Sequence, residues 1–268
     1  MPITFDFGNT PEGEAFFERF PKFYPAFERL IQLTNKSFGP RHVSSSLEAT
    51  CVSLGFTCCV DLSEIVFLGV NGHSIGATKI LRGLYERAVT LAYLLKDPEK
   101  VDRFVAYGAI IEHKLIQEAR KHTPDEEIER HLGTDSIAKI EERYSEYKHL
   151  FLRAGGKKLA PSWDIPFASQ VENVGSPFTD YYLAAYLLPT QHTHATLTSI
   201  NPPKNPAIRR HHSDFNVLMS EALLLKVVEL HNQKFPTVSE QELEAGNQDF
   251  QIVWVDFLHI PPRPKDSQ

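Results

Sequence analysis

The sequence predicts an all-α fold, a multi-helix bundle that ends in a short C-terminal extended arm. First, four residue pairs place a capping side chain directly before proline, which is typical of a helix start because the cap accepts an unpaired backbone N–H and proline at the first helical position loses no bond. Second, apolar residues between these pairs recur at helical spacing. Third, alternation typical of strands is scarce. The four pairs are Thr10-Pro11, Asp97-Pro98, Thr123-Pro124 and Ser176-Pro177.

The helices follow in order from these starts and from glycine and proline stops. Pro21 and Pro25 should bend or divide the first helix, and Pro189 should kink the eighth. Glu126 stands three residues after Thr123 and would complete a capping box there. The predicted helices cover about residues 11–37, 46–68, 73–95, 98–121, 124–132, 134–154, 167–174, 177–198 and 213–234.

The C-terminal region gives the one signal for extended structure. Residues 250–260, with Ile252, Trp254 and Phe257, could form a short β element or an extended arm. The end from Pro261 is rich in proline and charge, so we expect it to be mobile. We therefore expect one helical domain over residues 1–235, and an arm with a tail over residues 236–268.

Length and charge limit the classes of protein. A chain of 268 residues can bury a sizeable core. Its net charge of -6 argues against a protein whose main work is gripping nucleic-acid backbone, although a local basic patch remains open. Three cysteines without metal-ligand spacing fit a reduced, cytoplasmic protein.

Two segments are possible membrane signals, the first residues of the sequence and its longest apolar stretch. The first residues lack the charged and apolar regions of a signal peptide. Residues 49–70 are apolar over roughly a membrane's length, but Asp61 and Glu64 interrupt them, and charges at that depth are costly. We interpret this segment as a buried core helix and expect no membrane contact.

Several short motifs in the middle of the chain resemble a bacterial domain-of-unknown-function family, number 5677. That family has an Arg-x-x-x-Glu helix, an Asp-Pro turn, and a tyrosine-rich helix that ends in a Ser-x-x-x-His element. The resemblance covers about residues 44–197, with Thr190 where serine is usual. The matching motifs are ILRGLYER at 80–87, YLLKDP at 93–98, Arg103-Phe104, Trp163, Tyr182, Tyr186, Thr190 and His194.

The helical layout of that family is similar to the HEPN and abortive-infection groups. Some of those proteins cut RNA and act in phage defence or in toxin–antitoxin pairs. The resemblance implies a HEPN-like bundle and a toxin-type ribonuclease acting in bacterial defence, but fold alone does not determine function.

Arg82 and Glu86 are the first candidate site residues. They stand i,i+4 on the helix over 73–95, on the side opposite an apolar stripe that contains Leu84 and Leu91. A salt bridge on a solvated face would explain the pair without any function. If another helix covers this face, the pair becomes a buried polar site, which is costly to keep unless it is used.

His194 is the third candidate, at the end of the tyrosine helix. Tyr182, Tyr186, Thr190 and His194 recur at i,i+4 and share one edge of that helix. In metal-free RNA cleavage, histidine or glutamate would take the 2′-hydroxyl proton and arginine would stabilise the phosphorane-like transition state. The same residues could instead bind a small anionic ligand without chemistry, and His194 could be a structural histidine.

The remaining histidine patterns are weaker evidence for a functional site. Arg143 and His149 match the arginine–histidine spacing of catalytic HEPN helices, but twelve histidines make such matches common by chance, so they are secondary candidates. His192 and His194 diverge by about 200° on a helix and cannot ligate one ion there. His211 and His212 could add ligands, or they could precede a helix start capped by Ser213 or Asp214.

We predict neither a metal nor a cofactor, because no glycine-rich phosphate loop, nucleophile elbow or HExxH motif is present. Three functions stay open: a ribonuclease or toxin using Arg82, Glu86 and His194; a non-catalytic module that senses a ligand or docks a partner; and a scaffold. The scaffold would be a homodimer formed through helical faces, with the aromatic first helix at the contact.

Overall fold

The computed structural model describes residues 11–153, 156, 158–193 and 204–258, and these confirm an all-α protein. The only β-type pairing among them is an isolated bridge between Leu152 and Leu159. The described residues divide into two compact units. The larger unit contains the chain up to Lys96 and from Val171 onward, and the smaller contains residues 97–170.

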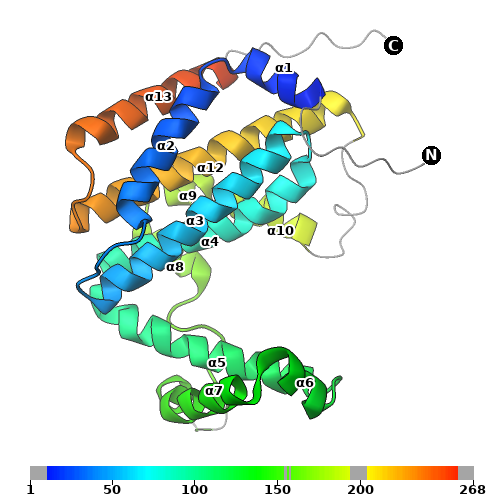
Figure 1. Ribbon diagram of the computed structural model, residues 1–268, viewed down its shortest axis with the longest axis vertical. Coiled ribbons are helices and arrows are strands. Elements are labelled where there is room, and N and C mark those ends of the chain that lie inside the picture. The colour runs from blue at the N-terminus through cyan, green and yellow to red at the C-terminus, as the bar shows by residue number, and fades with distance from the viewer. Residues whose placement is uncertain (1–10, 154–155, 157, 194–203, 259–268) are drawn as a thin grey trace. The chain divides into compact units, whose positions relative to one another are not determined.

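Three long helices form the centre of the larger unit. α3 and α4 are antiparallel neighbours, and α12 packs against both (Figure 1). The helices of this unit are α1 (Pro11–Arg19), α2 (Phe23–Phe38), α3 (Ser46–Val70), α4 (Ser74–Lys96), α9 (Phe178–Tyr182), the π-helical turn η3 (Leu183–Leu187), α10 (Leu188–Thr193), α12 (Pro206–Lys234) and α13 (Glu240–Leu258). α8 (Phe167–Val174) joins the two units along the chain.

α4 is buried on more of its circumference than the sequence predicts. The apolar stripe through Leu84 and Leu91 is fully buried, as expected. Helical spacing places Tyr93 on the same side as Arg82 and Glu86, but its side chain is only 1% exposed, because α12 and the segment from α9 to α10 cover faces that α3 leaves open. Lys79 on this side is exposed, and Arg82 and Glu86 are partly exposed.

The aromatic side chains at the start of the chain pack inside the larger unit. Phe16, Phe20 and Phe23 are buried with Val217 of α12 and Val253 of α13. α1 ends two residues before Pro21, so the predicted division of the first helix is confirmed, while Pro25 lies in the first turn of α2. Dimerisation through helical faces stays a prediction, but these aromatic rings already have partners within the chain.

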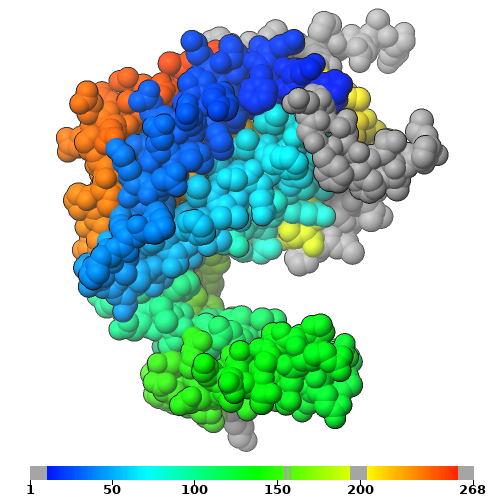
Figure 2. All heavy atoms as spheres, viewed as in Figure 1, coloured from blue at the N-terminus to red at the C-terminus, as the bar shows by residue number. Residues whose placement is uncertain are grey.

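α3 is the one helix among the described residues that is long and apolar enough to cross a membrane. Part of it lies open on the surface of the larger unit (Figure 2). Its exposed apolar side chains include Phe56, Val60 and Phe67, while Cys58 and Leu62 face the core. The predicted buried core helix is therefore buried along one face only.

Two of the four predicted cap-and-proline starts are one residue too early. α6 (Asp125–Leu132) begins after Pro124, so Thr123 is not its cap, and α9 begins after Pro177 rather than at it. The reason is that each proline has non-helical backbone angles and occupies the cap position itself, φ -58° and ψ 145° at Pro124, and φ -87° and ψ 0° at Pro177. Asp97-Pro98 opens a 3-10 turn, η1 (Pro98–Lys100), and Thr10 lies outside the described residues.

The last predicted helix starts earlier than expected. α12 begins at Pro206, with the side chain of Asn205 accepting a hydrogen bond from the Ala207 backbone N–H. Ser213 and Asp214 are therefore buried residues within the helix and not its caps. The pair Asn205-Pro206 is a cap-and-proline start of the kind that the sequence shows elsewhere.

The predicted extended arm is wrong, because residues 250–258 belong to the helix α13. Val253 and Phe257 stand i,i+4 and are buried against α1, α2 and α12, a helical spacing. The helix also begins with a capping box: the Ser239 hydroxyl accepts from the Glu242 N–H, and the Glu242 carboxylate accepts from the Ser239 N–H.

The smaller unit has a core of its own, in which Ile116, Ile128 and Ile137 are buried together. Arg120 ties its helices by donating to Asp125 and Glu141. Its elements after η1 are α5 (Val101–Ala119), α6, α7 (Thr134–Tyr147) and the 3-10 turn η2 (Lys148–Phe151).

Candidate functional site

The polar side of α4 faces the tyrosine segment. Arg82 donates from Nη2 to Oε1 of Glu86 over 2.9 Å, so the i,i+4 pair predicted from the sequence is formed. The guanidinium carbon of Arg82 lies 5.1 Å from the centre of the Tyr186 ring, a cation–π contact. The pair is thus partly covered by η3, and burial raises the pKa of Glu86 although Arg82 and Arg87 oppose that shift.

The tyrosine rings form a stack behind this pair. Tyr182 and Tyr186 lie 5.2 Å apart and nearly parallel, and both contact the ring of the fully buried Tyr85 on α4. The Tyr85 hydroxyl donates to the backbone carbonyl of Phe178 over 2.6 Å. Burial raises the pKa of Tyr85 above its usual range, so this hydroxyl stays protonated and acts as a hydrogen-bond donor.

The predicted kink at Pro189 takes the form of a π-helical turn just before it. In η3 the Leu188 N–H reaches back five residues to the Leu183 carbonyl. Such a turn contains one more residue than an α-helical turn. The hydroxyl of Thr190, a predicted site residue, donates to the Tyr186 carbonyl over 2.7 Å and thereby stabilises the same turn.

A cavity of about 490 Å³ lies between α4, α10 and α12. Its apolar wall is formed by Ala184, Leu188, Pro189 and Phe215. Thr78 of α4, one turn before Arg82, and Asn216 of α12 contribute neutral polar groups. They are bonded to each other, because Asn216 Nδ2 donates to Thr78 Oγ1 over 2.8 Å.

Gln191 of α10 and three histidines complete the lining of this cavity. The histidines are His192 from α10, and His211 and His212 from α12. Nδ1 of His192 is buried and has no hydrogen-bond partner within the described part of the chain. The pKa of His212 is lowered, first by burial and then by the charges of His211 and His192. His211 and His192 therefore lie close enough to His212 to disfavour its protonation.

The predicted site is brought together only in part. Arg82, Glu86, Tyr182 and Tyr186 converge, whereas His194 lies outside the described residues. The secondary candidates belong to the smaller unit, where Arg143 is paired with Glu112 over 3.1 Å, and where His149 is exposed in η2.

No metal-ligand group is formed by the residues that the structure describes. No three His, Cys, Asp or Glu side chains within residues 11–153, 156, 158–193 and 204–258 are placed to hold a metal ion. The paired histidines that could add ligands to His192, namely His211 and His212, line the same cavity as His192.

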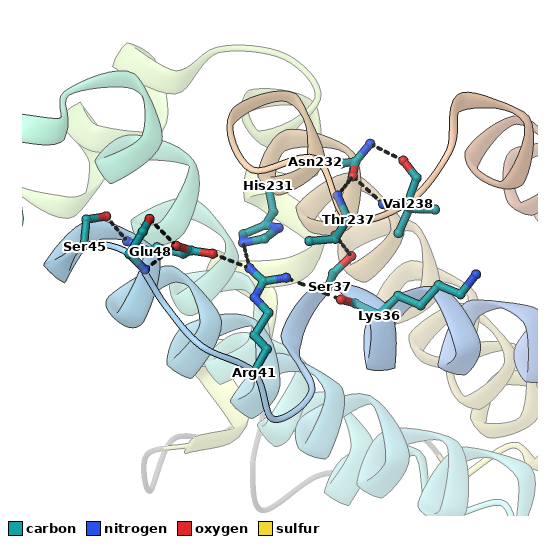
Figure 3. Close-up of polar contacts among 10 residues, drawn as sticks. Lys36, Ser37, Arg41, Ser45, Glu48, His231, Asn232, Thr237 and Val238 are labelled. Atoms are coloured by element: carbon teal, nitrogen blue, oxygen red, sulfur yellow. Dashed lines mark hydrogen bonds and ion pairs between the residues drawn. The ribbon is translucent and has the colours of Figure 1, made fainter.

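A second polar cluster was not anticipated from the sequence (Figure 3). Arg41, in the loop between α2 and α3, donates from Nη2 to Glu48 Oε1 over 2.9 Å and to Nε2 of the fully buried His231 over 3.2 Å. The other Glu48 oxygen accepts from the backbone N–H and hydroxyl of Ser44, both at 2.7 Å. These bonds pin the loop to the first turn of α3 and the last turns of α12.

The hydrogen bonds of this cluster fix the loop between α2 and α3 to its neighbouring helices. Both oxygens of Glu48 and both terminal nitrogens of Arg41 are engaged by protein groups. Burial and the Arg41 charge lower the pKa of His231 to about 4, so its ring is neutral and accepts the Arg41 bond. Residues 190 positions apart meet here, and no local pattern signals that pairing.

Comparison with known proteins gives one match. The model described as "Family of unknown function (DUF5677)" matches residues 49–204, which is more than half of the chain. That span includes Arg82, Glu86, the tyrosine rings and His192, but not His212 or the Arg41 cluster. No curated protein and no solved structure matches the chain.

Proposed function

We propose a function on the premise that the chain belongs to the DUF5677 family of unknown function. Because the family description assigns no activity, the proposal rests on this chain's own side chains. The protein is a non-catalytic ligand-sensing module: the cavity between α4, α10 and α12 binds a small molecule with an apolar body.

The cavity itself supports this proposal. Ligand sites are typically concave, largely apolar and of about 300–1,000 Å³, with a few polar groups that orient the ligand. The cavity of about 490 Å³ has these properties, with Leu188, Pro189 and Phe215 in its apolar wall and with imidazole, hydroxyl and amide groups as its polar groups. Its walls come from helices that the buried core of the larger unit fixes, so a ligand would find the site formed in advance.

N-phenyl-1-naphthylamine, a neutral dye that fluoresces in apolar surroundings, tests the proposal. We expect the protein to bind it, and Ala184→Trp to weaken binding by about tenfold or more because the indole fills the cavity. Leu183→Trp is the matched control, since Leu183 is the preceding residue of η3 but is exposed and outside the lining. Unchanged dye binding by a folded Ala184→Trp protein would exclude the cavity as the site.

A second function is favoured by the Arg82 contacts: metal-independent RNA cleavage of the HEPN type, in bacterial defence. Arg82 is oriented by Glu86 and Tyr186, as a group that must meet a phosphorane-like transition state should be. The raised pKa of Glu86 brings this carboxylate closer to the basicity that a general base needs at neutral pH. His194 would complete the set as the second acid–base group.

Incubation of the protein with total cellular RNA tests this second function. We expect Arg82→Ala to lose about a hundredfold in cleavage rate, as loss of one transition-state donor typically does. Lys79→Ala is the control, since it removes an exposed positive charge from the same helix. RNA that stays equally intact with the wild-type protein and with Arg82→Ala would eliminate the ribonuclease.

A further inference from the structure

We infer that the ligand of the cavity between α4, α10 and α12 carries an acidic group, which the imidazoles of His192 and His212 bind with uptake of a proton. This inference rests on the proposed ligand-binding function and names the chemical class of the ligand. It is carried by the positions of the imidazoles, by an unpaired buried nitrogen and by the charges around the cavity.

The imidazoles approach the cavity from two elements. His192 lies on α10 and His212 on α12, and both line the cavity. His211, the third, has its ring stacked on Phe257 at 5.1 Å, so its position is fixed by packing against α13. His192 and His212 are thus the two rings left to contact a ligand.

One ring nitrogen of His192 has no partner among the described residues. Its Nδ1 is buried and makes no hydrogen bond to any of them. A buried polar atom without a partner is destabilising, so such atoms are rare unless a ligand or water completes them. The neutral polar groups that α4 and α12 contribute to the lining, Thr78 and Asn216, are bonded to each other.

The charges around the cavity favour an anionic group in the ligand. The described lining contains no aspartate, glutamate, lysine or arginine from α4, α10 or α12. Asp214 lies close enough to His211 to feel its charge, but both carboxylate oxygens of Asp214 are bound by Arg19. Within the described lining, an imidazolium at His192 or His212 therefore has no carboxylate partner, and an acidic ligand would supply one.

Proton uptake follows from this arrangement. Burial and the neighbouring imidazoles of His211 and His192 lower the pKa of His212, so the empty site favours the neutral form of this ring. An anion beside an imidazole raises its pKa, so the bound state favours the imidazolium. Affinity for an acid that is always ionised must then increase as the pH falls, by up to about tenfold per pH unit for one proton.

Two dyes that differ by one acidic group test this inference. 1-Anilinonaphthalene-8-sulfonate carries a sulfonate that N-phenyl-1-naphthylamine lacks, and the sulfonate stays ionised. From about pH 8 to about pH 6, we expect binding of the sulfonate to tighten by about three- to tenfold per unit, and binding of the neutral dye to stay constant. The neutral dye thus controls for any effect of pH on the fold.

Variants assign the effect to the imidazoles. The double variant His192→Gln and His212→Gln should lose the pH dependence of sulfonate binding and keep its affinity for the neutral dye. His42→Gln, an exposed histidine elsewhere in the larger unit, should behave as the wild type. Sulfonate binding that is absent, or that follows the neutral dye at every pH, would overturn the acidic ligand while leaving the cavity as a binding site. Failure of the neutral dye to bind would overturn the proposed function itself.

Discussion

At the scale of single residues, Glu221 on α12 is a buried carboxyl group whose pKa is not shifted by any charged partner within the described part of the chain. Its side chain is 1% exposed, and neither carboxylate oxygen has a hydrogen-bond partner among the residues that the structure describes. Burial raises its pKa to about 8. The native protein therefore holds this carboxyl protonated at neutral pH, while the unfolded chain, with an ordinary value of 4.5, releases the proton.

We expect Glu221→Gln to be more stable than the wild type at alkaline pH and similar to it at acidic pH. Because the folded pKa is raised, the wild type loses stability as the pH rises from about 4.5 to about 8, and the loss then levels off. The amide removes that loss, a gain on the order of a few kcal/mol at about pH 9. Thermal unfolding followed by circular dichroism checks it, with the exposed Glu244→Gln as control.

The pKa shift of His231 makes stability depend on pH in the opposite direction to that of Glu221. Its pKa is lowered to about 4 in the folded protein by burial and by Arg41, against an ordinary value of 6.5. The stability that depends on its neutral ring is present above about pH 6.5 and is lost as the pH falls to about 4. We expect His231→Gln to flatten urea midpoints across this range. A wild-type urea midpoint that rises steadily as the pH falls from about 6.5 to about 4 would contradict the buried neutral ring.

The predictability of the candidate site differs from residue to residue. Arg82 and Glu86 could be predicted as a pair because helical spacing alone brings them together. The cluster of Arg41, Glu48 and His231 could not, because its partners approach through tertiary packing over 190 positions. His212 was noticed as a possible metal ligand, but only the placement of α12 beside α10 gives its imidazole a neighbour in His192.

At the scale of elements, α2 and α3 are in closest contact at Gly55. A β-carbon built on Gly55 would stand 2.4 Å from the ring of Phe38. That ring is buried and also packs edge-on against His231, so it cannot move freely. This glycine is required by the approach of a neighbouring helix and not by its own backbone conformation.

We expect Gly55→Ala to lower stability by about 1–3 kcal/mol, because one added carbon overfills the contact. Gly108 in α5 is the counterpart, since a β-carbon there meets nothing within 4 Å. Gly108→Ala should therefore stabilise α5 by about 0.5–1 kcal/mol, the usual gain of alanine over glycine in a helix. Amide hydrogen exchange measures the change in stability for each helix separately. A change in stability of the same sign in both variants would contradict the packing argument.

Most helices could be predicted from local signals, but their first and last residues were predicted less accurately. Pro21 and Pro25 mark the division of α1 from α2, and Gly133 marks the end of α6. The extended arm was wrong because the exposed Ile252 and half-buried Trp254 obscured the helical spacing of the buried Val253 and Phe257. The capping box at the start of α13 was a local signal that could have corrected it.

At the scale of the whole molecule, residues 97–170 form a compact unit within the chain of the larger one. Apolar helical spacing continues through both units, so the boundary leaves little trace in the sequence. The segments that flank the smaller unit meet in the larger one, where Lys96 donates from Nζ to the backbone carbonyl of Asn173. The buried cluster of the smaller unit, Ile116 with its neighbours, lies entirely within residues 97–170.

We expect the larger unit to fold when residues 98–169 are replaced by a short glycine–serine linker. The reason is that its core and its cavity are lined by side chains from outside that range. The measurement is binding of N-phenyl-1-naphthylamine, which should stay within about threefold of the full chain if the cavity is kept. Loss of helical circular dichroism beyond that of the deleted helices would show that the two units depend on each other.

The π-helical turn at Leu183–Leu187 makes the segment before α10 unequally sensitive to the loss and the gain of one residue. Because a π-helical turn contains one residue more than an α-helical turn, the loss of one residue here leaves an ordinary α-helical turn, and α10 keeps its orientation. The gain of one residue in the regular turn that follows rotates the rest of α10 by about 100° and moves His192 out of the cavity wall. Related proteins that keep the cavity should therefore show deletions of one residue in this turn more often than insertions.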